Sequence, residues 1–140
     1  MHPTLIMTVG LPRSGKSTWA KKQNLPIVNP DAIRLALHCK AFEPDAERMV
    51  WTIAHYMVKS LFLAGHKRVI LDATNTTRER RDEWRAPREM WNREYRLFRA
   101  SRSTCISRAI KDDKYELFGD GGVIERMAIS LEWPTLDETP

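Results

Sequence analysis

Residues 10–18, Gly-Leu-Pro-Arg-Ser-Gly-Lys-Ser-Thr, constrain what this chain can fold into more than any other stretch. They fit the P-loop pattern G-x-x-x-x-G-K-[ST], which holds nucleotide phosphates only where it joins a strand to a helix. An apolar run at 4–9 precedes the P-loop, and residues 17–22 are typical of the start of a helix. Because both flanks have the required character, they favour a true P-loop over a chance match in a Gly/Ser loop.

Each part of the P-loop has a physical task. Gly10 and Gly15 allow backbone turns that a Cβ would forbid, so the loop amides form a nest for anions at the positive end of the following helix. Lys16 is expected to reach the β- and γ-phosphates, and the Ser17 hydroxyl to ligate Mg²⁺. Nucleotide contacts are predicted at Leu11, Pro12, Arg13, Ser14, Gly15, Lys16, Ser17 and Thr18. The expected cofactors are therefore Mg²⁺ and ATP or another nucleoside triphosphate.

The length and composition narrow the class of protein. A chain of 140 residues predicts one domain, 1–140, with a single hydrophobic core. Cys39 and Cys105 form neither a metal-binding pattern nor a disulfide framework. No charged segment precedes the first apolar run, and no apolar stretch approaches the roughly 18 residues of a membrane-spanning helix. These features predict a cytoplasmic protein that has no contact with membranes.

Strand and helix patterns alternate along the chain. Apolar runs predict strands at 4–9, 25–28, 68–72 and 95–100, while periodic or capped stretches predict helices from 17, at 31–37, at 45–64, from 78 and at 123–131. The helix at 45–64 is expected to bury a stripe of Met49, Val50, Ile53, Met57, Leu61 and Ala64. Ser103 or Thr104 is expected to cap a short helix carrying Arg108, residues 111–122 resemble a mobile lid in composition, and the acidic tail after Pro134 is expected to be loose. The alternation predicts an α/β fold, with a small parallel sheet covered by helices on both faces and a helical lid.

A carboxylate ends the third predicted strand. Residues 68–71 are followed by Asp72, the arrangement called Walker B, in which an acid beside the P-loop helps to hold Mg²⁺. The metal ligands are therefore predicted to be Ser17 and Asp72. Ligands of parallel α/β sheets bind at the carboxyl ends of the strands, and Asn75 falls at that edge as well.

A second carboxylate follows the second predicted strand. Asn29 is expected to cap a helix with Pro30 at its first position and Asp31 in its first turn. Asp31 and Arg34, three residues apart, should share one face of this helix. An acid so close to a triphosphate has either a catalytic role or only the weak role of a favourable charge at a helix N-terminus.

The segment 78–108 holds ten arginines, no lysine and five acidic residues, a balance equal to the +5 net charge of the whole chain. Arginine suits bidentate recognition of phosphates, which indicates a polyanionic partner. For individual arginines the favoured interpretation is a solvated helix face with ion pairs. Thr77 is expected to cap the helix, and Pro87 to kink or divide it. Trp84 and Trp91 are expected to be core residues, with a base-stacking platform as the alternative.

These motifs resemble those of the bacteriophage-type polynucleotide 5′-kinases. The resemblance is carried by residues 8–20, by Asn29-x-Asp31-x-x-Arg34, by 69–75 followed by Arg80-Arg81, by Arg108 and by 123–127. It implies a P-loop kinase fold in which Asp31 is the general base, Arg34 grips a substrate phosphate and Arg108 is a lid arginine over the γ-phosphate. The expected catalytic residues are Asp31, Lys16 and Arg108, and the expected substrate contacts are Arg34, Asn75 and Arg78.

The sequence also departs from this family. Arg13 stands where the family often has Gly, and the lid region holds Lys111, Lys114 and Gly121-Gly122 in place of a second arginine and a Val-Pro pair. The resemblance implies phosphoryl transfer to a 5′-hydroxyl end or to a hydroxymethylated base, with DNA favoured over RNA and action in the cytoplasm, including the host cytoplasm for a phage enzyme. The alternatives are a small-molecule or nucleotide kinase of the same fold and a non-catalytic, NTP-dependent nucleic-acid-binding protein.

Overall fold

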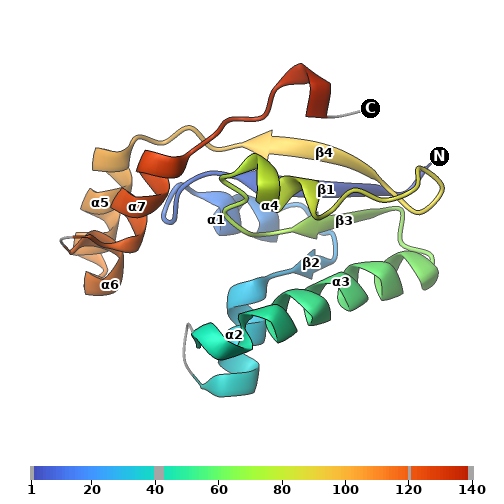
Figure 1. Ribbon diagram of the computed structural model, residues 1–140, viewed down its shortest axis with the longest axis horizontal. Coiled ribbons are helices and arrows are strands. Elements are labelled where there is room, and N and C mark those ends of the chain that lie inside the picture. Colours follow the sequence, from blue (N-terminus) through green and yellow to red (C-terminus); the bar gives the residue numbers. More distant parts are fainter. Residues whose placement is uncertain (1, 40–42, 120, 139–140) are drawn as a thin grey trace.

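A computed structural model describes residues 2–39, 43–119 and 121–138 (Figure 1). The elements follow the order β1 (Thr4–Val9), α1 (Lys16–Lys21), β2 (Ile27–Val28), α2 (Pro30–His38), η1 (Pro44–Ala46), α3 (Glu47–Leu63), β3 (Arg68–Leu71), α4 (Arg78–Asp82), β4 (Asn92–Leu97), α5 (Arg102–Lys111), α6 (Tyr115–Phe118), α7 (Val123–Ser130) and η2 (Leu136–Glu138). None of the helices in these ranges is long and apolar enough to cross a membrane.

Four parallel strands form the sheet in the order β2-β3-β1-β4. Side chains alternate across β1, so that Leu5 and Met7 pack with α3, whereas Ile6 packs with Ala20 of α1 on the opposite face. The predicted parallel sheet with helices on both faces is therefore confirmed. Helices α5, α6 and α7 form a third group beyond the carboxyl ends of the strands (Figure 1). This group corresponds to the predicted helical lid.

The helix α3 begins two residues later than predicted, after the short turn η1, and it rotates its buried face away from the predicted stripe. Its fully buried positions are Val50, Ala54 and Val58, spaced four residues apart. Met49 and Met57 are 46% and 38% exposed, and Ala64 is also exposed, so the prediction was wrong for these three residues. The error arose because apolar character alone ranks methionine above alanine, whereas close packing on the sheet favours the small side chain of Ala54.

Three boundaries between 78 and 104 differ from prediction. The helix capped by Thr77 ends at Asp82, well before Pro87, so Pro87 lies in a turn and kinks no helix. β4 begins at Asn92, three residues earlier than predicted, because the backbone amide of Asn92 donates to the carbonyl of Pro3 and extends the parallel ladder with β1. Ser101, rather than Ser103 or Thr104, caps α5 by accepting from the amide of Thr104.

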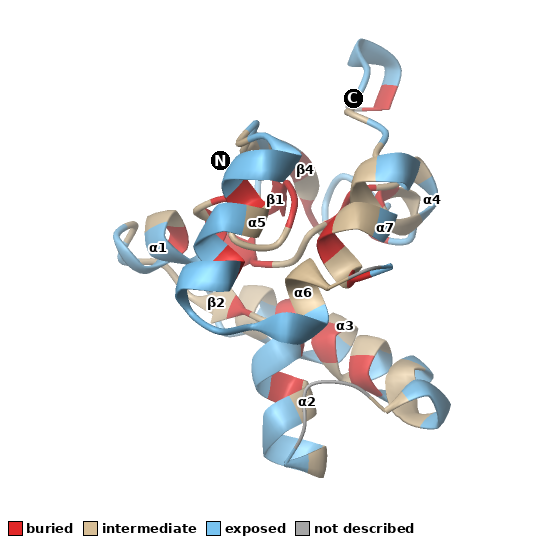
Figure 2. Ribbon diagram, turned by 90° about the vertical axis from the view of Figure 1, so that its left-hand side faces the viewer, coloured by how far each residue is buried: buried red, intermediate tan, exposed pale blue. Residues whose placement is uncertain are grey.

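The acidic tail is docked rather than loose. Glu138 is 2% exposed, and its carboxylate receives two hydrogen bonds of 2.8 Å from the guanidinium of Arg81. Arg93 donates to the backbone carbonyl of Glu138, and Arg78 pairs with Asp137 at 3.0 Å. Figure 2 shows the single buried position of η2 in an otherwise exposed segment. The prediction of a loose tail was wrong because it did not consider arginine partners far away in the sequence.

Candidate active site

The P-loop connects β1 to α1, as the sequence predicted, and its backbone follows the shape needed for a phosphate nest. Gly15 and Arg13 both adopt left-handed conformations, with φ of 102° and 69°. Arg13 thus occupies a backbone conformation that glycine adopts at no cost. Gly10 is required for a different reason, since a Cβ there would lie 2.7 Å from the carbonyl oxygen of Phe98. The loop therefore approaches the end of β4 too closely for any larger residue.

Lys16 is buried within the loop that it serves. Its Nζ donates to the carbonyl of Leu11 at 2.6 Å and to the Ser14 hydroxyl at 3.3 Å. Burial lowers the pKa of Lys16 from 10.5 to about 8, against the opposing charges of Asp72 and Asp31. The ammonium group is held by neutral acceptors only, so an incoming phosphate would relieve the cost of its burial.

The two predicted metal ligands lie together. The Ser17 hydroxyl donates to Oδ2 of Asp72 at 2.7 Å, and the Asn29 amide donates to the same oxygen at 3.1 Å. A hydroxyl beside a carboxylate suits Mg²⁺, a hard cation that takes few protein ligands and completes its shell with water and phosphate oxygens. Within the described ranges no cluster of three or more His, Cys, Asp or Glu could hold a metal by itself.

Sequence reasoning missed the second role of Asn29. Its side-chain oxygen caps α2 by accepting from the amide of Ala32 at 3.1 Å, as predicted. Its nitrogen meanwhile holds Asp72, so one amide joins the start of α2 to the candidate metal site. A signal was present in the sequence, because an Asn that directly follows a strand of the parallel sheet lies at the ligand-binding edge of that sheet.

Asp31 and Arg34 face each other on α2, as predicted, at 2.6 Å. The Asp31 side chain is 76% exposed and is therefore open to a substrate. Arg34 also makes a bidentate pair with Glu47 at 2.6 and 2.9 Å, which the sequence did not reveal. Burial opposes the charge of Arg34, but its hydrogen bonds to Glu47 and the nearby carboxylates raise its pKa above the ordinary value. Glu47 of α3 thus fixes the arginine that is expected to meet the acceptor.

Arg108 reaches the P-loop from α5. Its guanidinium donates to the backbone carbonyl of Arg13 at 2.9 Å, and Arg13 pairs with Asp112 at the end of the same helix at 3.0 Å. Two contacts therefore connect the P-loop to the helical group at the sheet edge. Arg13, which stands where the polynucleotide 5′-kinases often have glycine, is one of these two bridging residues, and Arg108 is the other.

The other two predicted substrate contacts have partners within the chain. Asn75 is 1% exposed and donates to the carbonyl of Thr8 at 2.8 Å, which ties the end of β3 to β1. Arg78 pairs with Asp137 and, at 3.8 Å, with Asp82. The amide nitrogen of Asn75 thus completes the backbone between two strands, while its Oδ1 atom is buried without a hydrogen-bond partner in the described part of the chain. Direct substrate contacts by Asn75 and Arg78 stay predictions.

The Arg-rich segment is divided among several structural tasks. Arg81 and Arg93 are buried, while Arg80 and Arg85 form surface ion pairs with Glu83 and Asp82. The surface pairs of Arg80 and Arg85 match the expected ion pairing of the individual arginines, whereas the burial of Arg81 and Arg93 differs from the expected solvated face. Trp84 and Trp91 are 0% and 6% exposed, which makes them core residues and overturns the alternative of a base-stacking platform.

The family model described as an AAA domain matches residues 5–127. This chain belongs to that AAA domain family. The AAA domain resembles one chain of the solved Pnkp1/Rnl/Hen1 complex, with 29% identity over 76% of its own length and a TM-score of 0.66. A chain of the Pnkp1/Rnl/Hen1 RNA repair complex is 23% identical over 94% of the length of the present chain, with a TM-score of 0.72. The protein spans only 39% and 45% of these two chains.

A gluconokinase from Sinorhizobium meliloti 1021 shares the fold of this AAA domain, with 22% identity over 96% of this chain and 78% of its own, and a TM-score of 0.62. No curated protein sequence matches the chain. The predicted P-loop kinase fold is thus confirmed, and such a fold implies nucleotide binding, typically with Mg²⁺. The phage-type specificity remains a prediction.

Proposed function

We propose that this AAA domain transfers the γ-phosphoryl group of ATP to a hydroxyl of a polynucleotide. The observation that carries the proposal is the pair of Asp31 and Arg34 beside the P-loop. Asp31 is near enough to Lys16 for its charge to raise the pKa of that lysine. A nucleotide switch would need no exposed carboxylate at this point, because it has no acceptor to deprotonate.

Phosphoryl transfer depends mainly on positioning and on neutralising charge. Lys16 and the P-loop amides would hold the β- and γ-phosphates. Ser17 and Asp72 would hold Mg²⁺, which neutralises charge on the phosphates when it is bound. Asp31 would accept the proton of the attacking hydroxyl, and Arg108 would turn from the Arg13 carbonyl to the γ-phosphate.

The polynucleotide acceptor is supported by Arg34, whose planar fork suits a phosphate next to the reacting hydroxyl. It is also supported by the 29% identity to a chain of a complex with Pnkp1 in its name. The related complex is an RNA repair complex, so the comparisons give the expected preference for DNA no support. We therefore propose an end hydroxyl of RNA or DNA, with a hydroxymethylated base in DNA as a further acceptor to test.

A small-molecule kinase is the second candidate. It is favoured by the ion pairs of Arg78, Arg80 and Arg85, whose charges are already met by carboxylates of the chain. The fold shared with a gluconokinase is compatible with a compact acceptor.

The two candidates separate in one transfer assay. Label from γ-labelled ATP would be followed onto 5′-hydroxyl RNA, 5′-hydroxyl DNA, 5′-phosphorylated DNA with a hydroxymethylated base, gluconate, and a sample without acceptor. Transfer to an oligonucleotide is expected, and Lys16→Ala should abolish it while circular dichroism shows an intact fold. Transfer to gluconate alone, or ATP hydrolysis with no labelled acceptor, would overturn the polynucleotide proposal.

A further inference from the structure

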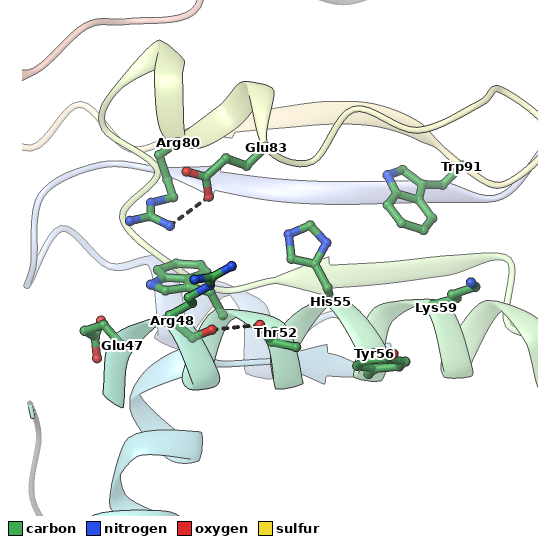
Figure 3. Close-up of a pocket in the computed structure, with 10 residues that line it drawn as sticks. Glu47, Arg48, Thr52, His55, Tyr56, Lys59, Arg80, Glu83 and Trp91 are labelled. Atoms are coloured by element: carbon green, nitrogen blue, oxygen red, sulfur yellow. Dashed lines mark hydrogen bonds and ion pairs between the residues drawn. The ribbon is translucent and has the colours of Figure 1, made fainter. Parts of the chain in front are cut away.

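A hollow of about 730 Å³ lies between the outer face of α3 and the segment from α4 to Trp91 (Figure 3). We call it the α3 groove. Because the line Val50, Ala54 and Val58 is buried against the sheet, the residues on the other side of the helix are turned toward the groove. These are Glu47, Arg48, Trp51, Thr52, His55, Tyr56 and Lys59.

The side chains that line the α3 groove carry a net positive charge once the ion pairs among them and their neighbours are taken into account. Its two acids are already neutralised, Glu47 by Arg34 and Glu83 by Arg80. Arg48 and Lys59 are exposed, and within the described part of the chain neither forms an ion pair. Among the described cations that line the groove, the two without an ion pair therefore both lie on α3, whereas Arg80 on the opposite wall is paired with Glu83.

The groove is continuous with the candidate acceptor site. The guanidinium carbon of Arg34 lies 5.8 Å from the centre of the Trp51 ring, and that of Arg80 lies 4.1 Å from the same ring. Trp51 therefore links the arginine beside Asp31 to the wall of the groove. An acceptor held at Asp31 and extending past Arg34 would meet this groove.

We propose that the α3 groove binds the single strand that continues beyond the reacting hydroxyl. This inference rests on the proposed function and extends it from the acceptor group to the polynucleotide itself. Arg48 and Lys59 bind phosphates, and Tyr56, which is 67% exposed, offers a ring for stacking a base. A cationic track beside aromatic rings is how proteins hold single strands without reading their sequence.

The length of the groove indicates how many nucleotides it holds. The helical rise of about 1.5 Å per residue puts Arg48 and Lys59 about 17 Å apart along α3. A single strand that keeps the stacked spacing of about 3.4 Å per nucleotide, as in one strand of B-form DNA, would cover this distance in about five steps. Acceptors shorter than this should reach Arg34 without engaging Lys59.

Equilibrium binding tests the groove without requiring catalysis. Fluorescence anisotropy would compare a labelled 5′-hydroxyl ten-nucleotide single strand on wild type and on Arg48→Ala/Lys59→Ala. Loss of two phosphate contacts should reduce the slope of log affinity against log salt by about 1.4, and affinity at 0.1 M salt by roughly 25-fold. The matched control is Lys21→Ala/Lys22→Ala, which removes two exposed cations at the end of α1, on the opposite face of the sheet, and should leave the slope unchanged.

Kinetics separate this inference from the proposed function. The double variant should raise KM for the ten-nucleotide acceptor while leaving kcat, and the KM for a dinucleotide, near the wild-type values. Wild-type affinity and salt slope in the double variant, with oligonucleotide transfer intact, would overturn the groove alone. Absence of transfer to any oligonucleotide by the wild type would overturn the proposed function, whatever the groove binds.

Discussion

Two bidentate arginine–carboxylate pairs, similar in geometry, hold opposite ends of this molecule. Arg34 binds Glu47 at 2.6 and 2.9 Å next to the candidate base, and Arg81 binds Glu138 at 2.8 Å twice under the C-terminal tail. The side chains of the first pair are 13% and 21% exposed, and those of the second are 0% and 1% exposed. The first arginine can exchange or share its partner with an incoming phosphate, whereas the second can only hold the fold.

The difference follows from what each pair joins. Glu47 lies at the start of α3, so its carboxylate positions Arg34 of α2 while both side chains stay partly exposed to solvent. Glu138 closes a structure in which Arg81 also donates to the carbonyl of Asn75 at 2.9 Å. A buried pair of this kind gives little net stability against an apolar substitute, but losing one partner leaves an uncompensated charge.

The largest effect is expected at the exposed end, from Asp31→Asn. A general base contributes roughly 10²–10⁴ in rate, so transfer to the acceptor should fall by that factor. Stability and ATP binding should hardly change, because asparagine has nearly the same size and Asp31 is mostly exposed. Steady-state kinetics with an oligonucleotide acceptor and nucleotide titration would measure both, and nearly wild-type transfer would remove Asp31 from the mechanism.

A substitution in the buried pair of Arg81 and Glu138 should lower stability, whereas Asp31→Asn should lower activity and leave stability nearly unchanged. Glu138→Gln should lower the free energy of unfolding by about 3–5 kcal/mol, since it leaves the charge of Arg81 without its partner. Asp137→Asn is the matched control in the same tail, because its pair with Arg78 is exposed to solvent, where an ion pair contributes little to stability. Urea titrations of both variants would show the difference, and equal losses would contradict the comparison of exposed with buried pairs.

The same pair predicts a pH dependence. Hydrogen bonds from Arg81 lower the pKa of Glu138 below its ordinary 4.5. The unfolded chain therefore binds more protons in this range, and the contribution of Glu138 is complete above about pH 4.5 and lost as the pH falls below it. The stability gap between wild type and Glu138→Gln should accordingly shrink in acid.

A smaller effect is expected from Arg34→Ala. A hydrogen bond to a charged group is worth about 1.5–3 kcal/mol, so KM for the acceptor should rise roughly 10- to 100-fold. The value of kcat should change less, because the contact with the substrate phosphate exists before the reaction. Glu47→Gln retains Arg34 but weakens its anchor, and should raise KM by less than Arg34→Ala. A fall in kcat alone would assign Arg34 to the transition state.

Local sequence was sufficient for the P-loop end and insufficient for the tail. The order of strand, P-loop and helix, the Asn29 cap and the nearness of Ser17 to Asp72 could all be predicted, because each depends on short motifs or on the shared edge of a parallel sheet. The pair of Arg81 and Glu138 joins residues 57 positions apart in the sequence. No periodicity or motif in the sequence encodes that distance, and the acidic composition of the tail pointed toward solvent.

Lys16 is a buried cation to compare with Arg34 and Arg81, but its hydrogen bonds go to neutral groups. The smallest expected effect is the change of nucleotide affinity with pH that Lys16 causes. Its pKa of about 8 means that the free protein binds less than a full proton here above pH 8. Bound phosphates would favour the ammonium form and raise this pKa, so nucleotide binding at pH 9 should take up a proton. Affinity should then fall by at most about tenfold per pH unit above 8. Calorimetry in buffers with different heats of ionisation would measure the uptake, which Lys21→Met should retain because Lys21 is exposed. Binding at pH 9 without proton uptake would mean that Lys16 is already charged in the free protein, and that its environment stabilises the charge as the environments of the paired arginines do.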